Sequence, residues 1–440
     1  MKRKLLVSVT LASLLASSLL TGCTLGGKTE SSTESSEVST AETTSTPTPT
    51  KEAEPDEPQE DIPAGMMKSY LTGEYVDEEV GSKRPYSFMI DNSKAANPQS
   101  SLASASLYYE APVEGGTTRI NAVFESVEGL TRIGPLRSCR DYFLSLTAGL
   151  DPLFVHYGQA AYALPYLESD NVDNISGLLS ATNSCFYRDS TFHSGEHSAY
   201  IGEDGLEQAV SIRDYSTEHD ANYEGMYNFA WVNEDVTDDS WTEASYVEPG
   251  YVINTPSFTY NAEDGLYYRD QFGSAHVDAE TGEQLTVTNI ILEYENYDIY
   301  QRNTIDHPVY LHFDTTSGGE GLYITGGKAV SITWERENFW DPVKYYLEDG
   351  TELKLNTGKT WTCLIQNENL SKCKIGADAS TAACVVSDEK VQEAAEENAD
   401  FMVSYEKTEE KYLAALSAER EKYIKKHGGT KVEEGTVTNS

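Results

Sequence analysis

The stretch from Pro85 to Gly158 reads PYSFMIDNSKAANPQSSLASASLYYEAPVEGGTTRINAVFESVEGLTRIGPLRSCRDYFLSLTAGLDPLFVHYG and decides the fold. It contains four short runs rich in β-branched and aromatic residues, at 86–90, 107–111, 120–124 and 153–157. Apolar residues recur at helical spacing over 136–148, after Gly134-Pro135. Strands that alternate with helices predict a layered domain with a mixed sheet whose polar strand ends meet at one edge.

The second half of the chain has the pattern of antiparallel strands. Residues 257–261 and 266–270 are joined by Ala-Glu-Asp-Gly, which is a hairpin signal, and residues 285–300 alternate as one long strand. We therefore expect an α+β (α/β) protein. Its N-terminal α/β domain, residues 66–248, would have a mixed β-sheet flanked by helices, and a mostly antiparallel β domain would follow at residues 249–384.

Residues 385–440 form a third part, which we expect to be a charged helix and a disordered tail. Ser387 is a good N-cap, and two glycines at 428–429 would end the helix. The apolar stripe of this helix starts at Val391 and is interrupted at Asn398, Glu409 and Glu419. The interruptions favour a helix that lies against the body or projects alone over a dimeric coiled coil.

The N-terminus has the three regions of a lipoprotein signal. Three basic residues at 2–4 precede an apolar run that is too short for a safe membrane span, and Leu20-Thr-Gly-Cys23 follows. We expect residues 1–23 to be the signal peptide and lipobox, with lipid on Cys23. The alternative is an ordinary secretory peptide. Residues 24–65 are rich in Ser, Thr, Pro and Glu and would form a disordered tether on the outer face of the cytoplasmic membrane.

The formal charge is −40, from 32 basic and 72 acidic residues. A surface of this sign repels nucleic acid and anionic lipid headgroups, so we expect no nucleic-acid partner. Five cysteines remain after Cys23, and an odd number argues against a disulfide framework. Cys363 and Cys373 could pair in an oxidising setting, and buried free thiols are the alternative.

Arginines crowd one part of this acidic chain. Arg119, Arg132, Arg137 and Arg140 lie close in sequence to Asp91, Glu110 and Glu114. Guanidinium groups suit a phosphate or carboxylate held by two parallel hydrogen bonds, while the carboxylates orient the arginines. The alternative is a buried ion-pair network without a ligand. A ligand site requires at least two guanidiniums that converge on a solvent-accessible cleft with donors left unpaired, whereas a structural network uses every donor.

The chain resembles the YerB-like envelope lipoproteins, a family without a settled biochemical function. The resemblance rests on short motifs between Pro85 and Gln366, including Phe88-Met-Ile-Asp-Asn92, Ile133-Gly-Pro135 and Phe186-Tyr-Arg-Asp189 in the first half and Phe258-Thr-Tyr260 and His276-Val-Asp278 in the second. It adds Asn92, Ser138, His156, Arg188 and His197 to the candidate ligand-binding residues. The sequence departs from the family pattern after His156 and after His197.

The sequence contains only poor matches to metal-binding and catalytic motifs. His193 and His197 bracket Ser-Gly-Glu, which is not the His-Glu-x-x-His spacing of a zinc helix, so we expect no metal site. Ser138, His156 and Asp91 lack a nucleophile-elbow signature, and Cys139 has no neighbouring His. Catalytic residues therefore stay unassigned, and no cofactor is expected.

These observations favour a surface-tethered binding or scaffolding lipoprotein that recognises an anionic envelope ligand or a partner protein. The alternative is an envelope enzyme of phosphoryl or glycosyl transfer or hydrolysis, with the arginine cluster as an anion clamp. The membrane would be contacted through the lipid on Cys23.

Replacing Cys23 tests the anchor. Cys23→Ala should leave the protein unprocessed or release it from the membrane fraction, because no thiol remains to carry the lipid. Incorporation of labelled fatty acid measures the effect, and Cys384→Ala serves as the matched control that should keep its label. Equal labelling of Cys23→Ala and the wild type would contradict the assignment.

Overall fold

The computed structural model describes residues 60–232, 234–299 and 310–402. The expected signal peptide, the lipobox Cys23, the tether up to residue 59 and the tail beyond residue 402 lie outside this part. Within it, no helix has both the length and the apolar character needed to cross a membrane.

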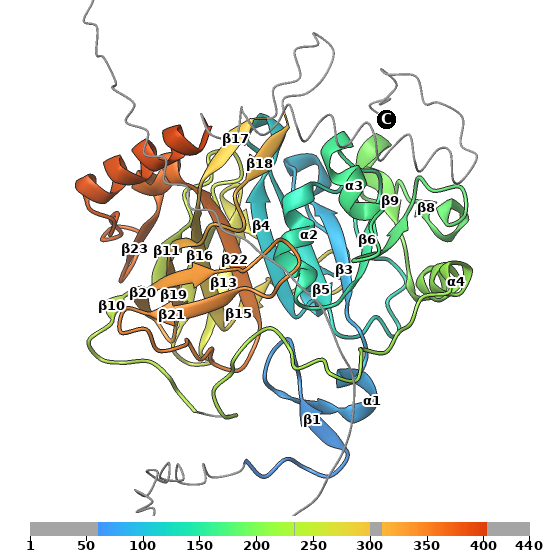
Figure 1. Ribbon diagram of the computed structural model, residues 1–440, viewed down its shortest axis with the longest axis horizontal. Helices are drawn as coiled ribbons and strands as arrows, with labels where there is room; N and C mark the ends of the chain where they lie inside the picture. The colour runs from blue at the N-terminus through green and yellow to red at the C-terminus, as the bar shows by residue number, and fades with distance from the viewer. Residues whose placement is uncertain (1–59, 233, 300–309, 403–440) are drawn as a thin grey trace, which may run out of the picture. The chain divides into compact units, whose positions relative to one another are not determined.

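One eleven-stranded sheet forms the centre of the fold (Figure 1). Its strands in spatial order are β10 (Thr242–Glu243), β20 (Lys328–Glu335), β19 (Gly319–Thr325), β16 (Asn289–Glu295), β22 (Thr360–Gln366), β4 (Leu107–Pro112), β5 (Thr118–Phe124), β3 (Tyr86–Asp91), β6 (Leu153–His156) and β7 (Asp173–Ser176), and β21 (Lys344–Leu347) pairs with β20. The four β-rich runs that open the sequence analysis are β3, β4, β5 and β6. Parallel pairs β3–β6 and β6–β7 make the sheet mixed, as expected.

The sheet is continuous across the expected domain boundary at residue 248. Strand β22 from the second half pairs in parallel with β4 from the first half, with Thr360 opposite Leu107 and Cys363 opposite Glu110. Residues on the two sides of residue 248 therefore contribute strands to one sheet, and their apolar side chains share the same core.

A second, six-stranded antiparallel sheet packs on one face of the central sheet. Its strands are β14 (Ser274–Ala275), β13 (Leu266–Gln271), β12 (Ser257–Asn261), β11 (Tyr246–Glu248) and β23 (Lys374–Gly376), with β15 (Thr286–Val287) on β13. The expected hairpin is β12–β13. Phe258 from this sheet lies with its ring centroid 5.7 Å from that of Trp361, which stacks on Tyr108 of β4. One apolar core thus joins the two sheets.

Helices α2 (Asp141–Ala148) and α3 (Leu164–Leu167) cover the other face. Helix α4 (Glu203–Arg213) instead buries Leu206 and Ala209 in the core on the side of the second sheet, and α1 (Glu78–Gly81) packs on β1 and β2. Phe143 and Leu146 of α2 pack in a second core with Met89 of β3 and Tyr109 of β4. Because successive residues of a strand point to opposite faces, Met89 and its neighbour Ile90 belong to different cores.

Short two-stranded ladders and turns complete the described part. The ladders are β1 (Met66–Lys68) with β2 (Tyr75–Asp77), β8 (Tyr187–Arg188) with β9 (Ala199–Tyr200), and β17 (Tyr297–Ile299) with β18 (Leu311–Phe313). The 3₁₀ segments are Lys94–Ala96, Leu102–Ser104, Glu114–Gly116, Ala161–Ala163, Asn183–Cys185, Gly195–Ser198 and Asn367–Lys372.

The helix expected over residues 136–148 begins later, at Asp141. The preceding residues are extended because their backbone pairs with β3: Asp91 N–H donates to Pro135 O, and Arg137 N–H donates to Met89 O, at 2.9 and 2.8 Å. Tertiary pairing therefore overrides the helical period. Cys139 lies in this extended segment and not in a helix.

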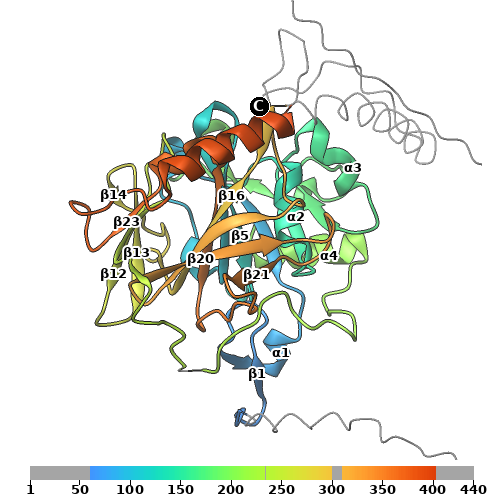
Figure 2. The ribbon, with the colours of Figure 1, turned by 60° about the vertical axis from the view of Figure 1, so that its left-hand side comes forward.

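Residues 388–402 are helical and lie against the body (Figure 2). Val391 and Ala394 pack on the core between the sheets, and Asn398, which interrupts the sequence stripe, is buried. The Asn398 side-chain oxygen accepts a hydrogen bond of 2.6 Å from the Tyr297 N–H. A polar residue that breaks the apolar pattern thus makes the docking contact, because it satisfies a backbone donor of β17.

The five cysteines of the described part are free thiols, and Cys363 does not pair with Cys373. Burial raises the pKa of Cys139 and of Cys363, which suits the alternative of unreactive buried thiols.

A buried ion pair joins the two halves at the β22–β4 junction. Glu110 and Arg269 are each 0% exposed, with 2.8 Å between a carboxylate oxygen and Nη2. The Glu110 carboxylate also accepts hydrogen bonds from Asn92, Thr118, Asn254 and Trp361, at 3.0, 2.6, 2.7 and 3.1 Å. The guanidinium lies 4.4 Å from the Trp361 ring centroid. Both charges are therefore enclosed by partners from the two halves.

Removing one partner of this pair should destabilise the fold strongly. Arg269→Met leaves the Glu110 carboxylate buried without its counter-charge, and the expected loss is about 3–5 kcal/mol of unfolding free energy. Urea denaturation measures it. Adding Glu110→Gln should recover part of the loss, because the uncompensated charge is then gone. A single-variant loss below about 1 kcal/mol would show that the pair does not hold the halves together.

Candidate functional site

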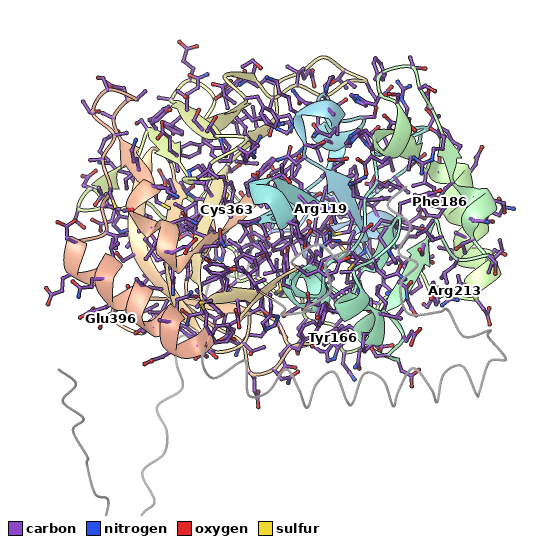
Figure 3. The ribbon with its side chains drawn as sticks, turned by 90° about the horizontal axis from the view of Figure 1, so that it is seen from above. Arg119, Tyr166, Phe186, Arg213, Cys363 and Glu396 are labelled. Carbon is purple, nitrogen blue, oxygen red and sulfur yellow. The ribbon has the colours of Figure 1, made fainter. Side chains whose placement is uncertain are left out.

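Polar side chains gather at one edge of the central sheet, as the strand pattern predicts. The parallel strands β3 and β6 end there with Asp91 and His156, and antiparallel β5 begins there with Arg119 directly opposite Asp91. Asp91 and Arg119 point to the face that α2 covers, since Met89 of the same alternation belongs to that core. Figure 3 looks onto the molecule from above and labels Arg119 near its middle.

The extended segment before α2 adds two more arginines. Its backbone pairing with β3 sets Arg137 beside Asp91, and Arg140 occupies the N-cap position of α2. The Ser138 carbonyl accepts hydrogen bonds from Arg119 Nη1 and, at 3.3 Å, from Arg140 Nη1. Two guanidinium groups therefore meet at one carbonyl, and the third, that of Arg137, lies beside Asp91.

Arg140 is fully engaged by the protein. Its Nε and Nη2 bind the Glu114 carboxylate at 2.9 and 2.5 Å, and its Nη1 donates to the carbonyls of Ser138 and Cys139. Burial alone would raise the pKa of Glu114, but the hydrogen bond and charge of Arg140 outweigh it and lower the pKa. This pair behaves as the structural alternative predicts.

Asp91 binds a histidine and a second arginine. One Asp91 oxygen lies 2.7 Å from His197 Nδ1 and 3.4 Å from Arg137 Nε, and the other accepts from the Ser93 N–H at 2.9 Å. Burial opposes ionisation, yet the His197 hydrogen bond and the Arg137 charge lower the pKa of Asp91 to about 2. The same hydrogen bond raises the pKa of His197. Arg137 Nη1 also binds Glu196 at 2.7 Å.

Arg119 differs from its neighbours because it has no carboxylate partner among the described residues. It is 7% exposed, and its hydrogen bond to the Ser138 carbonyl occupies one of five N–H donors. None of its other nitrogens is both buried and unpartnered, so its free donors reach the surface. Burial, followed by the charges of Arg140 and Arg137, lowers the pKa of Arg119 to about 9.

We call Asp91, Glu114, Arg119, Arg137, Arg140, Glu196 and His197 the sheet-edge cluster. It contains three of the four arginines that the sequence groups together, and one of them keeps donors open to solvent. The sequence analysis did not predict Glu196 as a site residue, because it considered that residue only within the His193–His197 segment, which does not match a zinc motif.

Glu110 and Asn92 lie on the opposite face of the sheet and do not join the cluster. Asn92 follows Asp91, so its side chain points away from α2 and donates to Glu110 at 3.0 Å. Both belong to the buried network around Arg269. The Nε of Arg269 has no hydrogen-bond partner, but it is buried and does not face the surface. The only local sequence signal that distinguishes these two residues from Asp91 is the alternation of side chains between the two faces of a strand.

Arg132 is also separate. Its Nη1 and Nε bind Asp189 and Glu280, each at 2.7 Å, and its guanidinium lies 4.5 Å from the Phe192 ring centroid. Two carboxylates and one ring therefore satisfy it. It stands close to the other arginines in sequence, but its carboxylate partners are different from theirs.

The two remaining candidates have different surroundings. His156 is buried, with Nδ1 2.6 Å from the Gly158 carbonyl and Nε2 3.3 Å from Asn174 Oδ1, and burial lowers its pKa. It holds the end of β6 and does not face a ligand. Arg188 is exposed, stacks 4.9 Å from the Tyr157 ring centroid and donates to the Gly195 carbonyl at 2.6 Å.

Across residues 60–232, 234–299 and 310–402, no group of three or more His, Cys, Asp or Glu residues has the geometry of a metal site. His193 Nε2 lies 2.9 Å from the Pro98 carbonyl, so it turns away from His197, which faces Asp91.

Comparison with known proteins matches both halves of the chain. Residues 71–216 match the model described as protein of unknown function (DUF3048) N-terminal domain, and residues 247–362 match its C-terminal domain. The chain is 30% identical over 316 residues to "Putative lipoprotein YerB" of Bacillus subtilis (strain 168), covering 72% of this chain and 89% of that protein. The crystal structure of YerB from Bacillus subtilis superposes with a TM-score of 0.59 at 27% identity, covering 72% of this chain and 99% of that one. The resemblance drawn from the short motifs is confirmed.

The Asp91–His197 contact should make stability depend on pH. The pKa of His197 is raised from 6.5 in the folded state, so its stabilising contribution is fully present below pH 6.5 and is lost as pH rises through the folded pKa. The melting temperature difference between the wild type and His197→Gln should therefore be larger at pH 5 than at pH 9. In an Asp91→Asn background the difference should no longer vary with pH. A constant difference in both backgrounds would rule out the coupling.

Proposed function

The chain belongs to the DUF3048 family, and from that premise we propose that it is a lipid-anchored cell-envelope protein whose sheet-edge cluster binds an anionic envelope ligand or partner. Lipid on Cys23 would hold it at the outer face of the cytoplasmic membrane. The acidic segment of residues 24–65 would keep the folded part away from the bilayer.

The incomplete pairing of Arg119 carries this proposal. Arg119 has little exposure and no carboxylate in ion-pair contact, and burial with the charges of Arg140 and Arg137 outweighs the more distant charges of Glu114 and Asp91 in its pKa. Such a group is unfavourable unless a further partner compensates it. The usual ways to compensate such a group are pairing and hydrogen bonding. An anion that accepts the free donors of Arg119 would supply both at once.

The charges around Arg119 also favour an anion. Glu114 neutralises Arg140 through two hydrogen bonds, and Arg137 shares Asp91 and Glu196. Arg119 is left as the arginine of the sheet-edge cluster without a carboxylate in ion-pair contact among the described residues, and protonation of His197 would add a second positive charge. A phosphate group matches a planar guanidinium in geometry and in sign.

The Asp91–His197 contact supports the enzymatic alternative. Asp91 orients His197 through Nδ1, which leaves Nε2 on the other side of the ring, 3.8 Å from a Glu196 oxygen. A carboxylate that orients a histidine is the arrangement of a general base. Transfer or hydrolysis of a phosphoryl group would then proceed beside the anion held by Arg119.

Substituting Arg119 tests the anion site. Inorganic pyrophosphate should stabilise the chain without its signal and Cys23, residues 24–440, in a saturable way that thermal denaturation measures. Arg119→Met should abolish most of that stabilisation, with binding weakened about 10- to 100-fold, the range of lost charge-assisted hydrogen bonds. Without pyrophosphate, Arg119→Met should be as stable as the wild type or more stable, because a strained buried charge is removed.

Arg132→Met is the matched control. It removes an arginine that two carboxylates already satisfy, so it should lower stability and leave the pyrophosphate effect intact. A purely structural role for Arg119 would give the reverse pattern, with a lower melting temperature for Arg119→Met and no effect of pyrophosphate on the wild type. Phosphorus NMR of the same samples detects any orthophosphate formed, which would favour the enzyme.

A further inference from the structure

Two exposed leucines lie beside the sheet-edge cluster. Leu178 and Leu179 follow β7, whose last residue is Ser176, and their side chains are 60% and 37% exposed. Strand β7 is parallel to β6, so both strands end at the edge where the cluster lies. Adjacent leucines on the surface of so acidic a chain are poorly explained by folding, because they contribute little to either core.

Leu178 lies close to Ser138, which binds Arg119. A Cβ atom placed on Gly158, which has a positive φ of +87°, would lie 3.1 Å from Leu178 Cδ1 and 3.0 Å from Ser138 Oγ. Leu178 and Ser138 therefore both lie next to the buried Gly158. The Ser138 carbonyl accepts the hydrogen bond of Arg119. Ser138, which is half-buried, thus contacts Arg119 and lies next to the exposed Leu178.

A further positive charge borders the apolar side. A Cβ placed on Gly177, which precedes Leu178, would lie 2.2 Å from the Tyr157 ring, and Arg188 stacks over that ring at 4.9 Å. Arg188 forms no ion pair with a carboxylate in the part of the chain that the structure describes. Two arginines that lack a carboxylate partner among the described residues therefore lie near Leu178, Arg119 beyond Ser138 and Arg188 beyond Tyr157.

We propose that the anionic ligand is a single-chain amphiphile with a phosphate or diphosphate headgroup. The headgroup binds Arg119, and the hydrocarbon chain passes Ser138 to lie on Leu178 and Leu179. This inference rests on the proposed anion site and adds the apolar half of the ligand. An amphiphile gains from both surfaces, whereas a free anion uses only the first.

The overall charge argues against a bilayer as the occupant. The chain carries −40, which repels an anionic membrane surface as a whole. A single phosphorylated chain brings one headgroup to one incompletely paired guanidinium and avoids most of that repulsion. Docking on vesicles is accordingly an outcome that would overturn the proposal.

Chain length is the variable that tests it. Isothermal titration of residues 24–440 with ethyl phosphate and with decyl phosphate, the latter below its critical micelle concentration, should give a dissociation constant at least about tenfold lower for decyl phosphate. A tenfold gain corresponds to burial of roughly two methylene groups. Decyl maltoside, which has the same chain and no phosphate, should bind far more weakly than decyl phosphate.

Variants separate the two halves of the ligand. The double variant Leu178→Ser, Leu179→Ser should bind ethyl phosphate like the wild type and lose the advantage of decyl phosphate. Arg119→Met should lose both ligands. Ile212→Ser removes another exposed apolar side chain, 45% exposed at the end of α4, and should change neither affinity. Unaltered melting temperatures of the serine variants confirm that they are folded.

Each failure has its own meaning. No binding of ethyl phosphate, decyl phosphate or pyrophosphate to the wild type overturns the anion site and with it this inference. Equal affinities for ethyl and decyl phosphate overturn only the amphiphile and leave the anion site standing. If phosphatidic acid vesicles bind in a way that depends on the leucines while monomeric decyl phosphate does not bind, the amphiphile proposal is overturned in favour of a membrane surface. If decyl maltoside binds as tightly as decyl phosphate, the proposal is overturned in favour of a nonspecific apolar patch.

Discussion

The fold depends on one carboxylate that is shut away from water, Glu110. Taking a carboxylate and a guanidinium into the interior costs several kcal/mol for each ion unless hydrogen bonds replace the lost water. Arg269, Asn254 and Trp361 supply those bonds from the second half of the chain, while Asn92 and Thr118 supply them from the first. Neither half can satisfy the network alone, which explains why one continuous sheet and one core span both.

The arginines on the two faces of these strands differ in how far the protein pairs them. On the face covered by the second sheet, Glu110 and Arg269 are both enclosed, and Glu110 accepts as many bonds as its two oxygens can hold. On the face covered by α2, Arg140 is closed by Glu114, but Arg119 keeps donors that no described carboxylate accepts. Burial makes an open donor costly, so the contrast between two arginines around one carbonyl distinguishes the candidate site from the structural ion pairs.

Long-range charge sets a further condition on any ligand. The negative charge of the chain repels anions at a distance, but salt screens that repulsion over about 8 Å at physiological ionic strength. At contact, the local guanidinium dominates and the hydrogen bonds are directional. A ligand that also buries apolar surface on Leu178 and Leu179 gains a contribution that salt does not screen. The acidic surface therefore slows the approach of anions to the sheet-edge cluster, but it does not prevent an anion from binding there.

The sequence by itself determined the family, the α+β class, the strands at 86–90, 107–111, 120–124 and 153–157, and the edge at which polar strand ends meet, because each follows from local periodicity or short motifs. It could not divide the charged residues between the two faces, since a shift of one residue moves a side chain such as Asn92 or Asp91 from one core to the other. It also could not show that residues 136–140 are extended or that Asn398 is a docking contact, because distant backbone groups of β3 and β17 decide both. Which arginine stays unpaired was settled only by tertiary structure, because Glu114, Glu196 and Asp189 come from separate turns whose approach no local pattern encodes.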